Sequence, residues 1–310
     1  PDGTSTWLPV DDHPLDKATW TFAITVPVGT MAIANGALRS RTVRSGHTTW
    51  TWDQTEPMAS YLITLLVGDY DLVDGGVTDD GTILAHAVLA DRRATLDPYL
   101  ALTEDQLTFF EQWFGSYPFD RYGISITDSA PGLAMEAQGL SLFSSSDLDG
   151  SLGAFQHLLT SHELAHQWFG DAVSPSSWDD IWLNEGFATY AQWMWLDEAG
   201  FDDVASSAGL ALRSLPDDGG PVSDPVDLFG SVSYDGGAVA LHALRRTIGD
   251  DAFFTGLQAW VRTHIDGAAG TDDFRSVMEE ASGEDLSRFF ADWIDAATRP
   301  ASFPPAMLTG

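Results

Sequence analysis

Two histidines that lie four residues apart, with a glutamate directly after the first, are the part of the sequence best suited to chemistry. They are His162 and His166 in the stretch TSHELAHQWFGDAV (160–173), and the glutamate is Glu163. On an α-helix, residues four apart share a face, so both imidazoles could bind one metal ion while Glu163 lies beside it. The alternative is a helix whose two histidines are ordinary buried polar residues.

A catalytic zinc site of this form needs a third protein ligand and one position left for water. Glu185, in the stretch IWLNEGFATY (181–190), stands 19 residues after His166. A helix that runs to Gly170 and a second helix that returns antiparallel would bring this carboxylate over the two histidines. A structural zinc site is usually closed by four protein ligands, commonly cysteines, and the chain has no cysteine. The pattern therefore indicates a catalytic site for one zinc ion per chain.

The elements that must position these residues follow from the hydrophobic periodicity. Residues 15–90 are predicted to be strands, because stretches such as ATWTFAITV and GHTTWTWDQ alternate apolar and polar residues between turn-forming segments. From about Leu96 the period becomes helical, with a short β-like stretch, YGISITDS, in between. Helices are predicted near 97–115, 152–170, 182–199, 237–248, 251–265, 271–281 and 285–296. This pattern predicts an α+β protein with an all-β domain over 1–93 and a mostly helical domain over 94–310.

Longer stretches around these motifs resemble one enzyme family, from about residue 7 to residue 305. HELAHQWFG followed by WLNEGFATY is similar to the gluzincin zinc aminopeptidases, the family of alanyl aminopeptidase and leukotriene hydrolase. WLPVDDHPLDKATWTFAITVP (7–27) resembles a segment of the family's amino-terminal β-domain. GLAMEAQGL (132–140) resembles its glycine-x-methionine-glutamate-asparagine motif, and YDGGAVALHAL (234–244) resembles the stretch with its catalytic tyrosine.

The resemblance implies a thermolysin-like catalytic domain that hydrolyses peptide substrates with zinc. It implies that His162, His166 and Glu185 bind the metal. It also implies that Glu163 acts as the general base that activates the attacking water.

The resemblance assigns three further residues to the substrate. Glu136 would bind the free α-amino group of a peptide, with Ala134 as a substrate-binding position of the same motif. Tyr234 would stabilise the oxyanion that forms when the peptide carbonyl is attacked.

The sequence departs from the family's pattern at three positions, none of which is a metal ligand or the base. In the glycine-x-methionine-glutamate-asparagine motif, which is the family's exopeptidase motif, Leu133 stands in place of the first glycine and Ala137 in place of the asparagine. Gly236 stands in place of the lysine that usually follows two residues after the tyrosine. Three functions therefore stay open: an aminopeptidase, an endopeptidase or broader amidase with relaxed recognition of the amino terminus, and a non-catalytic scaffold of the same fold. The family's β-domain is longer and many members carry a further helical domain, so we expect a truncated or compact member.

The net charge restricts the partners. Forty-six acidic residues face 14 basic ones, of which only Lys17 is lysine, and the formal net charge is −32. This charge argues against nucleic acid or an anionic membrane as a partner, because both bind positive surfaces. No stretch approaches the roughly 18 continuous apolar residues of a membrane-spanning helix. Acidic residues spread along the whole chain are typical of a well-solvated surface or of adaptation to high salt.

Overall fold

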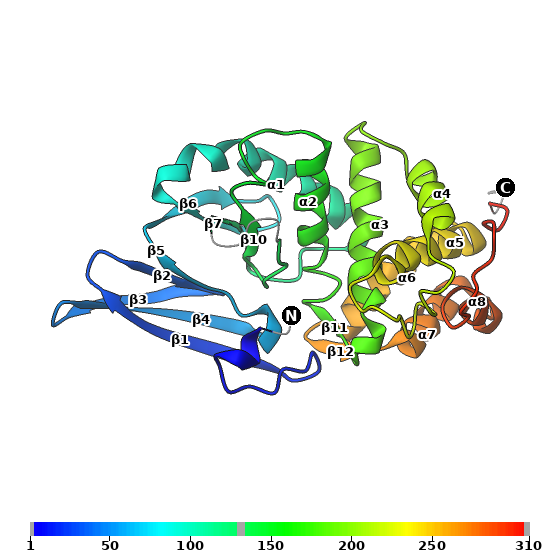
Figure 1. Ribbon diagram of the computed structural model, residues 1–310, viewed down its shortest axis with the longest axis horizontal. Coiled ribbons are helices and arrows are strands. Elements are labelled where there is room, and N and C mark those ends of the chain that lie inside the picture. Colours follow the sequence, from blue (N-terminus) through cyan, green and yellow to red (C-terminus); the bar gives the residue numbers. More distant parts are fainter. Residues whose placement is uncertain (1–2, 129–133, 307–310) are drawn as a thin grey trace. The chain divides into compact units, whose positions relative to one another are not determined.

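The computed structural model describes residues 3–128 and 134–306 (Figure 1). The chain divides into two units, of which the first comprises Pro1–Leu107 with Tyr117–Gln156 and the second comprises Thr108–Ser116 with His157–Gly310. Strands dominate the amino-terminal part and helices the carboxy-terminal part, which confirms the predicted α+β class. The predicted boundary at residue 93 coincides with the first residue of helix α1 (Arg93–Phe114), which contributes to both units, and that boundary stays a prediction.

The first unit opens with an antiparallel sheet in the order β1–β4–β3. Its strands are β1 (Lys17–Pro27), β3 (Ala37–Arg44) and β4 (His47–Ala59), and beside them β2 (Met31–Ala34) pairs with β5 (Leu65–Gly68). Burial alternates along β4 as expected for a strand with one covered face, and its buried residues include Trp50 and Trp52. The indole nitrogens of these tryptophans donate to the carbonyl oxygens of Thr30 and Ala32, so their polar atoms are satisfied inside the core.

A second, mixed sheet completes the first unit in the order β10–β9–β7–β6, with β8 beside β7. Its strands are β6 (Tyr70–Val77), β7 (Ile83–Leu89), β8 (Arg121–Tyr122), β9 (Ile124–Thr127) and β10 (Ser141–Ser144). β6 and β7 run antiparallel, whereas β7, β8, β9 and β10 pair in parallel. The β-like stretch predicted after the first helix is confirmed as β8 and β9.

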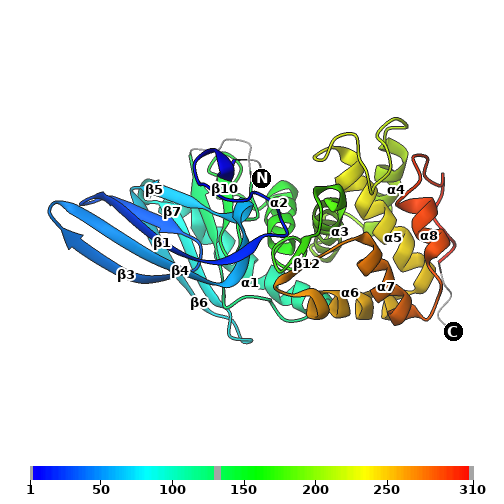
Figure 2. The same cartoon turned by 90° about the horizontal axis from the view of Figure 1, so that it is seen from below.

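The second unit is built from helices, of which α3 packs on α5, α5 on α6, and α6 on α7 (Figure 2). The helices are α2 (Ala154–Ala165), which begins in the first unit, α3 (Trp182–Glu198), α4 (Val204–Ser214), α5 (Gly237–Ile248), α6 (Asp250–His264), α7 (Thr271–Ser282) and α8 (Ser287–Trp293). Two short strands, β11 (Val173–Pro175) and β12 (Gly267–Ala269), pair in parallel. The sequence patterns did not predict α4, although the side chain of Asp203 accepts a hydrogen bond from the Ser206 amide at 2.8 Å and so caps its first turn.

Helix α2 is shorter than the predicted range of 152–170. After Ala165 the backbone tightens, since the amides of Gln167 and Trp168 donate to carbonyls only three residues earlier. Gly170 then adopts a φ of +127°, which a residue with a side chain rarely takes, and the chain turns into β11. The predicted length was wrong because an apolar helical pattern continues through this turn.

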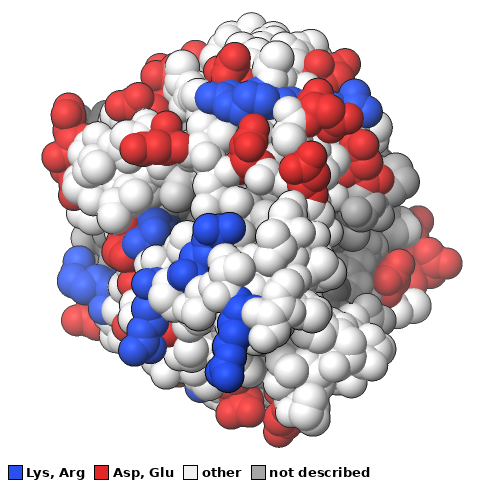
Figure 3. Space-filling model, turned by 90° about the vertical axis from the view of Figure 1, so that its left-hand side faces the viewer, with Lys and Arg blue, Asp and Glu red and all other residues white. Residues whose placement is uncertain are grey.

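The chain has only 14 lysines and arginines, and three of them lie on one strand. Strand β3 carries Arg39, Arg41 and Arg44, all exposed, and Figure 3 shows several basic side chains, among acidic ones, on the face that it presents. Within residues 3–128 and 134–306, no helix combines the length and the apolar character needed to span a bilayer.

Candidate metal centre

Helices α2 and α3 run antiparallel, as the sequence predicted for the two histidines and Glu185. Three contacts pair them in opposite chain order: His166, the residue after α2, with Glu185; His162 with Gln192; and His157 with Trp195. Aromatic packing next to the site supports this arrangement, because the rings of Phe169 and Phe187 stack with their centroids 4.5 Å apart. The turn after α2 is thereby held against α3.

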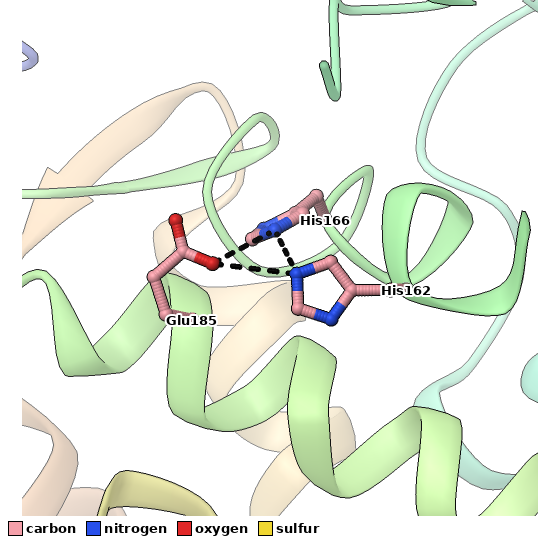
Figure 4. Close-up of side chains that lie close together, drawn as sticks. All are labelled: His162, His166 and Glu185. Carbon is pink, nitrogen blue, oxygen red and sulfur yellow. Dashed lines mark hydrogen bonds and ion pairs between the residues drawn. The ribbon is translucent and has the colours of Figure 1, made fainter. Parts of the chain in front are cut away.

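The side chains of His162, His166 and Glu185 converge on one point (Figure 4). The Nε2 atoms of the two histidines lie 3.2 Å apart. Glu185 Oε2 lies 3.4 Å from His162 Nε2 and 3.3 Å from His166 Nε2. The two imidazole planes are nearly perpendicular, at 82°, so their nitrogens approach the same point from different directions.

The outer nitrogens of the two rings determine where the protons lie. His162 Nδ1 is 2.9 Å from the side-chain oxygen of Gln192, and His166 Nδ1 is 3.1 Å from the backbone carbonyl of Phe169. Both oxygens can only accept, so each Nδ1 donates. In the neutral form, which has one N–H, each imidazole then carries a lone pair on Nε2 toward Glu185.

This donor set fits a zinc ion. Two imidazole lone pairs and a carboxylate oxygen face one another at a buried position, and a cation between them converts their mutual repulsion into attraction. Two nitrogens and one oxygen are ligands that zinc prefers, and three protein ligands are typical of its catalytic sites. Outer hydrogen bonds from each ring are the usual way in which proteins orient such histidines.

The carboxyl group of Glu185 is nearly inaccessible to water, with 5% of the residue exposed. Burial by itself raises the pKa of this carboxyl. When the imidazoles are protonated, the positive charge at His166 and hydrogen bonds from both histidines outweigh burial and hold the pKa below its ordinary value. Positive charge at this point therefore keeps Glu185 ionised.

Two other predicted residues lie in the same unit as this cluster. Glu163 follows His162 on α2 and is buried, with 5% exposed. Tyr234 belongs to a π-helical turn (Val232–Gly236) that leads into α5, and such turns occur frequently at functional sites. Its ring stacks on that of His162, with centroids 5.9 Å apart and planes at 10°. The second unit thus brings the proposed oxyanion donor beside a proposed metal ligand.

The stretch GLAMEAQGL (132–140), which resembles the family's glycine-x-methionine-glutamate-asparagine motif, belongs to the first unit. Glu136 is buried and lies in a tight hairpin closed by two hydrogen bonds between the backbones of Met135 and Leu142, at 2.9 and 2.8 Å. Ala134 precedes it and is half-buried, while Leu133, a departure from the family pattern, lies outside the described residues. Ala137 is 1% exposed. The roles of Glu136 and Ala134 stay predictions.

The sequence patterns identified neither acceptor that orients the histidines. The carbonyl of Phe169 carries no sequence signal, because any residue has one. Gln192 did carry a signal, since it stands seven residues after Glu185 and positions seven apart lie on the same face of a helix.

Family models match most of the chain. The model described as the peptidase family M1 domain matches residues 99–293, and that of the peptidase M1 N-terminal domain matches residues 1–62.

Named relatives agree with these models. Aminopeptidase 2 of Candida albicans is 29% identical over 322 residues, which cover 96% of this chain and 34% of the relative. The chain thus spans about a third of the length of the curated relatives it matches. The crystal structure of an M1 zinc metallopeptidase from Deinococcus radiodurans superimposes with a TM-score of 0.84 at 31% identity, covering 99% of this chain and 70% of that one. A mutant of that enzyme bound to a Tyr-Ser-Ala substrate gives a TM-score of 0.86, also at 31% identity, covering 97% and 69%.

Proposed function

The chain belongs to peptidase family M1, and from this premise we propose that it is a zinc-dependent aminopeptidase that hydrolyses the amino-terminal residue of peptides. The observation that carries the proposal is the convergence of His162 Nε2, His166 Nε2 and Glu185 Oε2 on one buried point. The names of its relatives, and the peptide bound by the Deinococcus radiodurans enzyme, support a peptide substrate.

In this proposal His162, His166 and Glu185 hold zinc, which supplies Lewis acidity that polarises the peptide carbonyl and lowers the pKa of water. Glu163 accepts a proton from the attacking water and passes it to the departing amine. The phenol of Tyr234 donates a hydrogen bond to the oxygen that becomes negative, as its place beside His162 allows.

The carboxylate of Glu136 is proposed to pair with the ammonium group of the substrate, with Ala134 contributing to the same recognition. A peptide whose amino group is free would then be cleaved after its first residue. Ala137, in place of the motif's asparagine, supports the second candidate, an endopeptidase or amidase with relaxed recognition of the amino terminus.

A panel of aminoacyl anilides, each with a free and an acetylated amino group, tests these alternatives. We expect hydrolysis of the free-amine compounds only, its loss with a zinc chelator, and its return when zinc is added. Equal hydrolysis of the acetylated compounds would favour the endopeptidase or amidase. A chain that binds no zinc on reconstitution and hydrolyses nothing would instead be a scaffold.

A further inference from the structure

One polar side chain next to the metal centre has a contact that the proposed reaction does not use. Gln192 is half-buried on α3, and its Oε1 lies 2.9 Å from Nδ1 of His162. We propose that Gln192 is a positioning residue that orients His162 for zinc, an inference that rests on the proposed zinc site.

The first step concerns the proton of His162. A neutral imidazole can carry its proton on either nitrogen, and only the form protonated on Nδ1 presents a lone pair at Nε2. The amide oxygen of Gln192 accepts from Nδ1–H and so selects that form. Without this acceptor, His162 would lose the interaction that holds both its proton and its ring in the orientation that zinc requires.

The second step concerns the element that carries the contact. Gln192 follows Glu185 by seven residues, two helical turns, or about 10 Å along α3. Because α2 runs antiparallel, the same face of α3 presents Glu185 to the inner nitrogens of both histidines and Gln192 to the outer nitrogen of His162. One rigid helix therefore supplies a metal ligand and the group that orients another ligand.

The third step is the difference between the two histidines. The outer nitrogen of His166 is held by the backbone carbonyl of Phe169, which side-chain substitution does not remove. The outer nitrogen of His162 is held by the uncharged side chain of Gln192. Position 192 is thus a place where a substitution can change zinc affinity without replacing a ligand, and a carboxylate there would be a stronger acceptor than the amide.

The test measures the dissociation constant for zinc by competition with a chromophoric chelator, using the full chain. Gln192→Leu removes the acceptor at similar volume, and we expect it to bind zinc about 10- to 100-fold more weakly. Gln192→Glu keeps an acceptor at this position and gives it a negative charge. We expect this variant to bind zinc more tightly than the parent. Cobalt-substituted protein adds a second readout, because a reoriented His162 changes the visible absorption bands of the metal in Gln192→Leu.

The matched control is Gln258→Leu on α6. Gln258 is also a half-buried glutamine, and its Nε2 donates to the carbonyl of Trp113 at 3.3 Å. Its loss should lower thermal stability without changing the zinc dissociation constant or the cobalt spectrum. This control separates a general loss of packing from an effect on His162.

A folded Gln192→Leu variant with the parent's zinc affinity would overturn the inference and leave the proposed function standing. If that variant does not fold, Gln192→Asn takes its place, because its shorter side chain withdraws the oxygen but stays polar, and unchanged affinity there is equally decisive. A parent chain that binds no zinc would refute the zinc site of the proposed function itself, and the inference with it.

Discussion

Glu163 stands between the two histidines in sequence and would take a proton from water in the proposed reaction. Replacing it with glutamine keeps the shape of the side chain but removes its basicity. We expect Glu163→Gln to retain zinc and to lose about 10² to 10⁴ in kcat, the usual contribution of a positioned general base. Metal content and the rate of anilide hydrolysis are the measurements, with Glu198→Gln at the exposed end of α3 as control. A rate near that of the parent would refute the role.

Tyr234 allows a substitution that separates its ring from its hydroxyl. Tyr234→Phe preserves the ring that stacks on His162 at 5.9 Å and removes only the O–H. We expect kcat to fall by about 10² or more, because one donor to the oxyanion is lost, while zinc affinity stays the same. If kcat is unchanged, the oxyanion must be stabilised by other groups.

His86 on β7 makes the stability of the fold depend on pH. Burial, together with the positive charge of Arg93, lowers the pKa of its imidazole from 6.5 to about 4. The unfolded chain therefore takes up a proton below pH 6.5 that the folded chain does not take up until about pH 4. Stability is complete above pH 6.5 and declines as the pH falls, with a loss of about 2 kcal/mol between pH 7 and pH 5 from this residue.

Urea unfolding at pH 7 and pH 5 measures this loss. His86→Gln should lower stability at pH 7, since it disturbs the contact between Nδ1 and the amide of Ile124, but should flatten the dependence on pH. The exposed His47→Gln is the control for loss of a histidine and should keep the parent's slope. A slope that persists in His86→Gln would assign the effect to other groups.

At the scale of elements, α3 must lie close to α5 for the site to form. Gly186 follows Glu185, and Gly237 is the first residue of α5, just after the turn that carries Tyr234. A Cβ added to Gly186 would lie 2.7 Å from Cα of Gly237, too close for the two backbones to stay in place. The glycines thus permit the approach that holds Glu185 and Tyr234 in one unit.

Gly186→Ala should therefore separate α3 from α5, lower stability by about 1–3 kcal/mol, and reduce kcat because Tyr234 moves with α5. The matched control is Gly209→Ala on α4, where the added Cβ would meet only the mobile end of Arg213 at 3.3 Å. That substitution should raise stability by up to about 1 kcal/mol through helix propensity. Thermal melts and anilide kinetics compare Gly186→Ala with Gly209→Ala. If both variants had the same stability and the same kcat, the close approach of α3 and α5 would be contradicted.

At the scale of the whole molecule, the charge of −32 leaves most carboxylates without a basic partner. The chain has 14 lysines and arginines for 46 acidic residues, so at least 32 carboxylates have no lysine or arginine of their own to pair with. The ion pairs of the described residues include exposed ones such as Arg288 with Asp292, which contribute little individually. The folded chain is therefore under electrostatic repulsion over its surface.

Added sodium chloride should raise the Tm, because screening shortens the reach of this repulsion from about 10 Å at 0.1 M to about 3 Å at 1 M. Salt can also stabilise proteins by exclusion from their surface, so a protein of near-neutral charge must be melted in parallel. We expect the Tm of the acidic chain to rise more steeply than that of the control. If the Tm of both proteins rose equally with sodium chloride, the acidic surface would contribute to solubility and not to the salt dependence of stability.

The sequence by itself determined what depends on neighbours along the chain. The spacing of His162 and His166 is a property of one helix, and the change from strand to helical periodicity near Leu96 predicted the α+β class. The pattern of Trp182–Glu198 likewise predicted α3 almost to its ends. In each case, residues a few positions apart define the geometry.

Only the tertiary structure decided which groups meet across the chain. The contact between His162 and Gln192 joins residues 30 positions apart, and the stacking of Tyr234 on His162 spans 72 positions. Both depend on how α2, α3 and α5 pack, which the close approach of Gly186 and Gly237 allows. The early end of α2 has the same origin, because pairing of β11 with β12 and the turn at Gly170 override a helical pattern that continues locally. Packing between distant segments is not encoded in the periodicity of either segment alone.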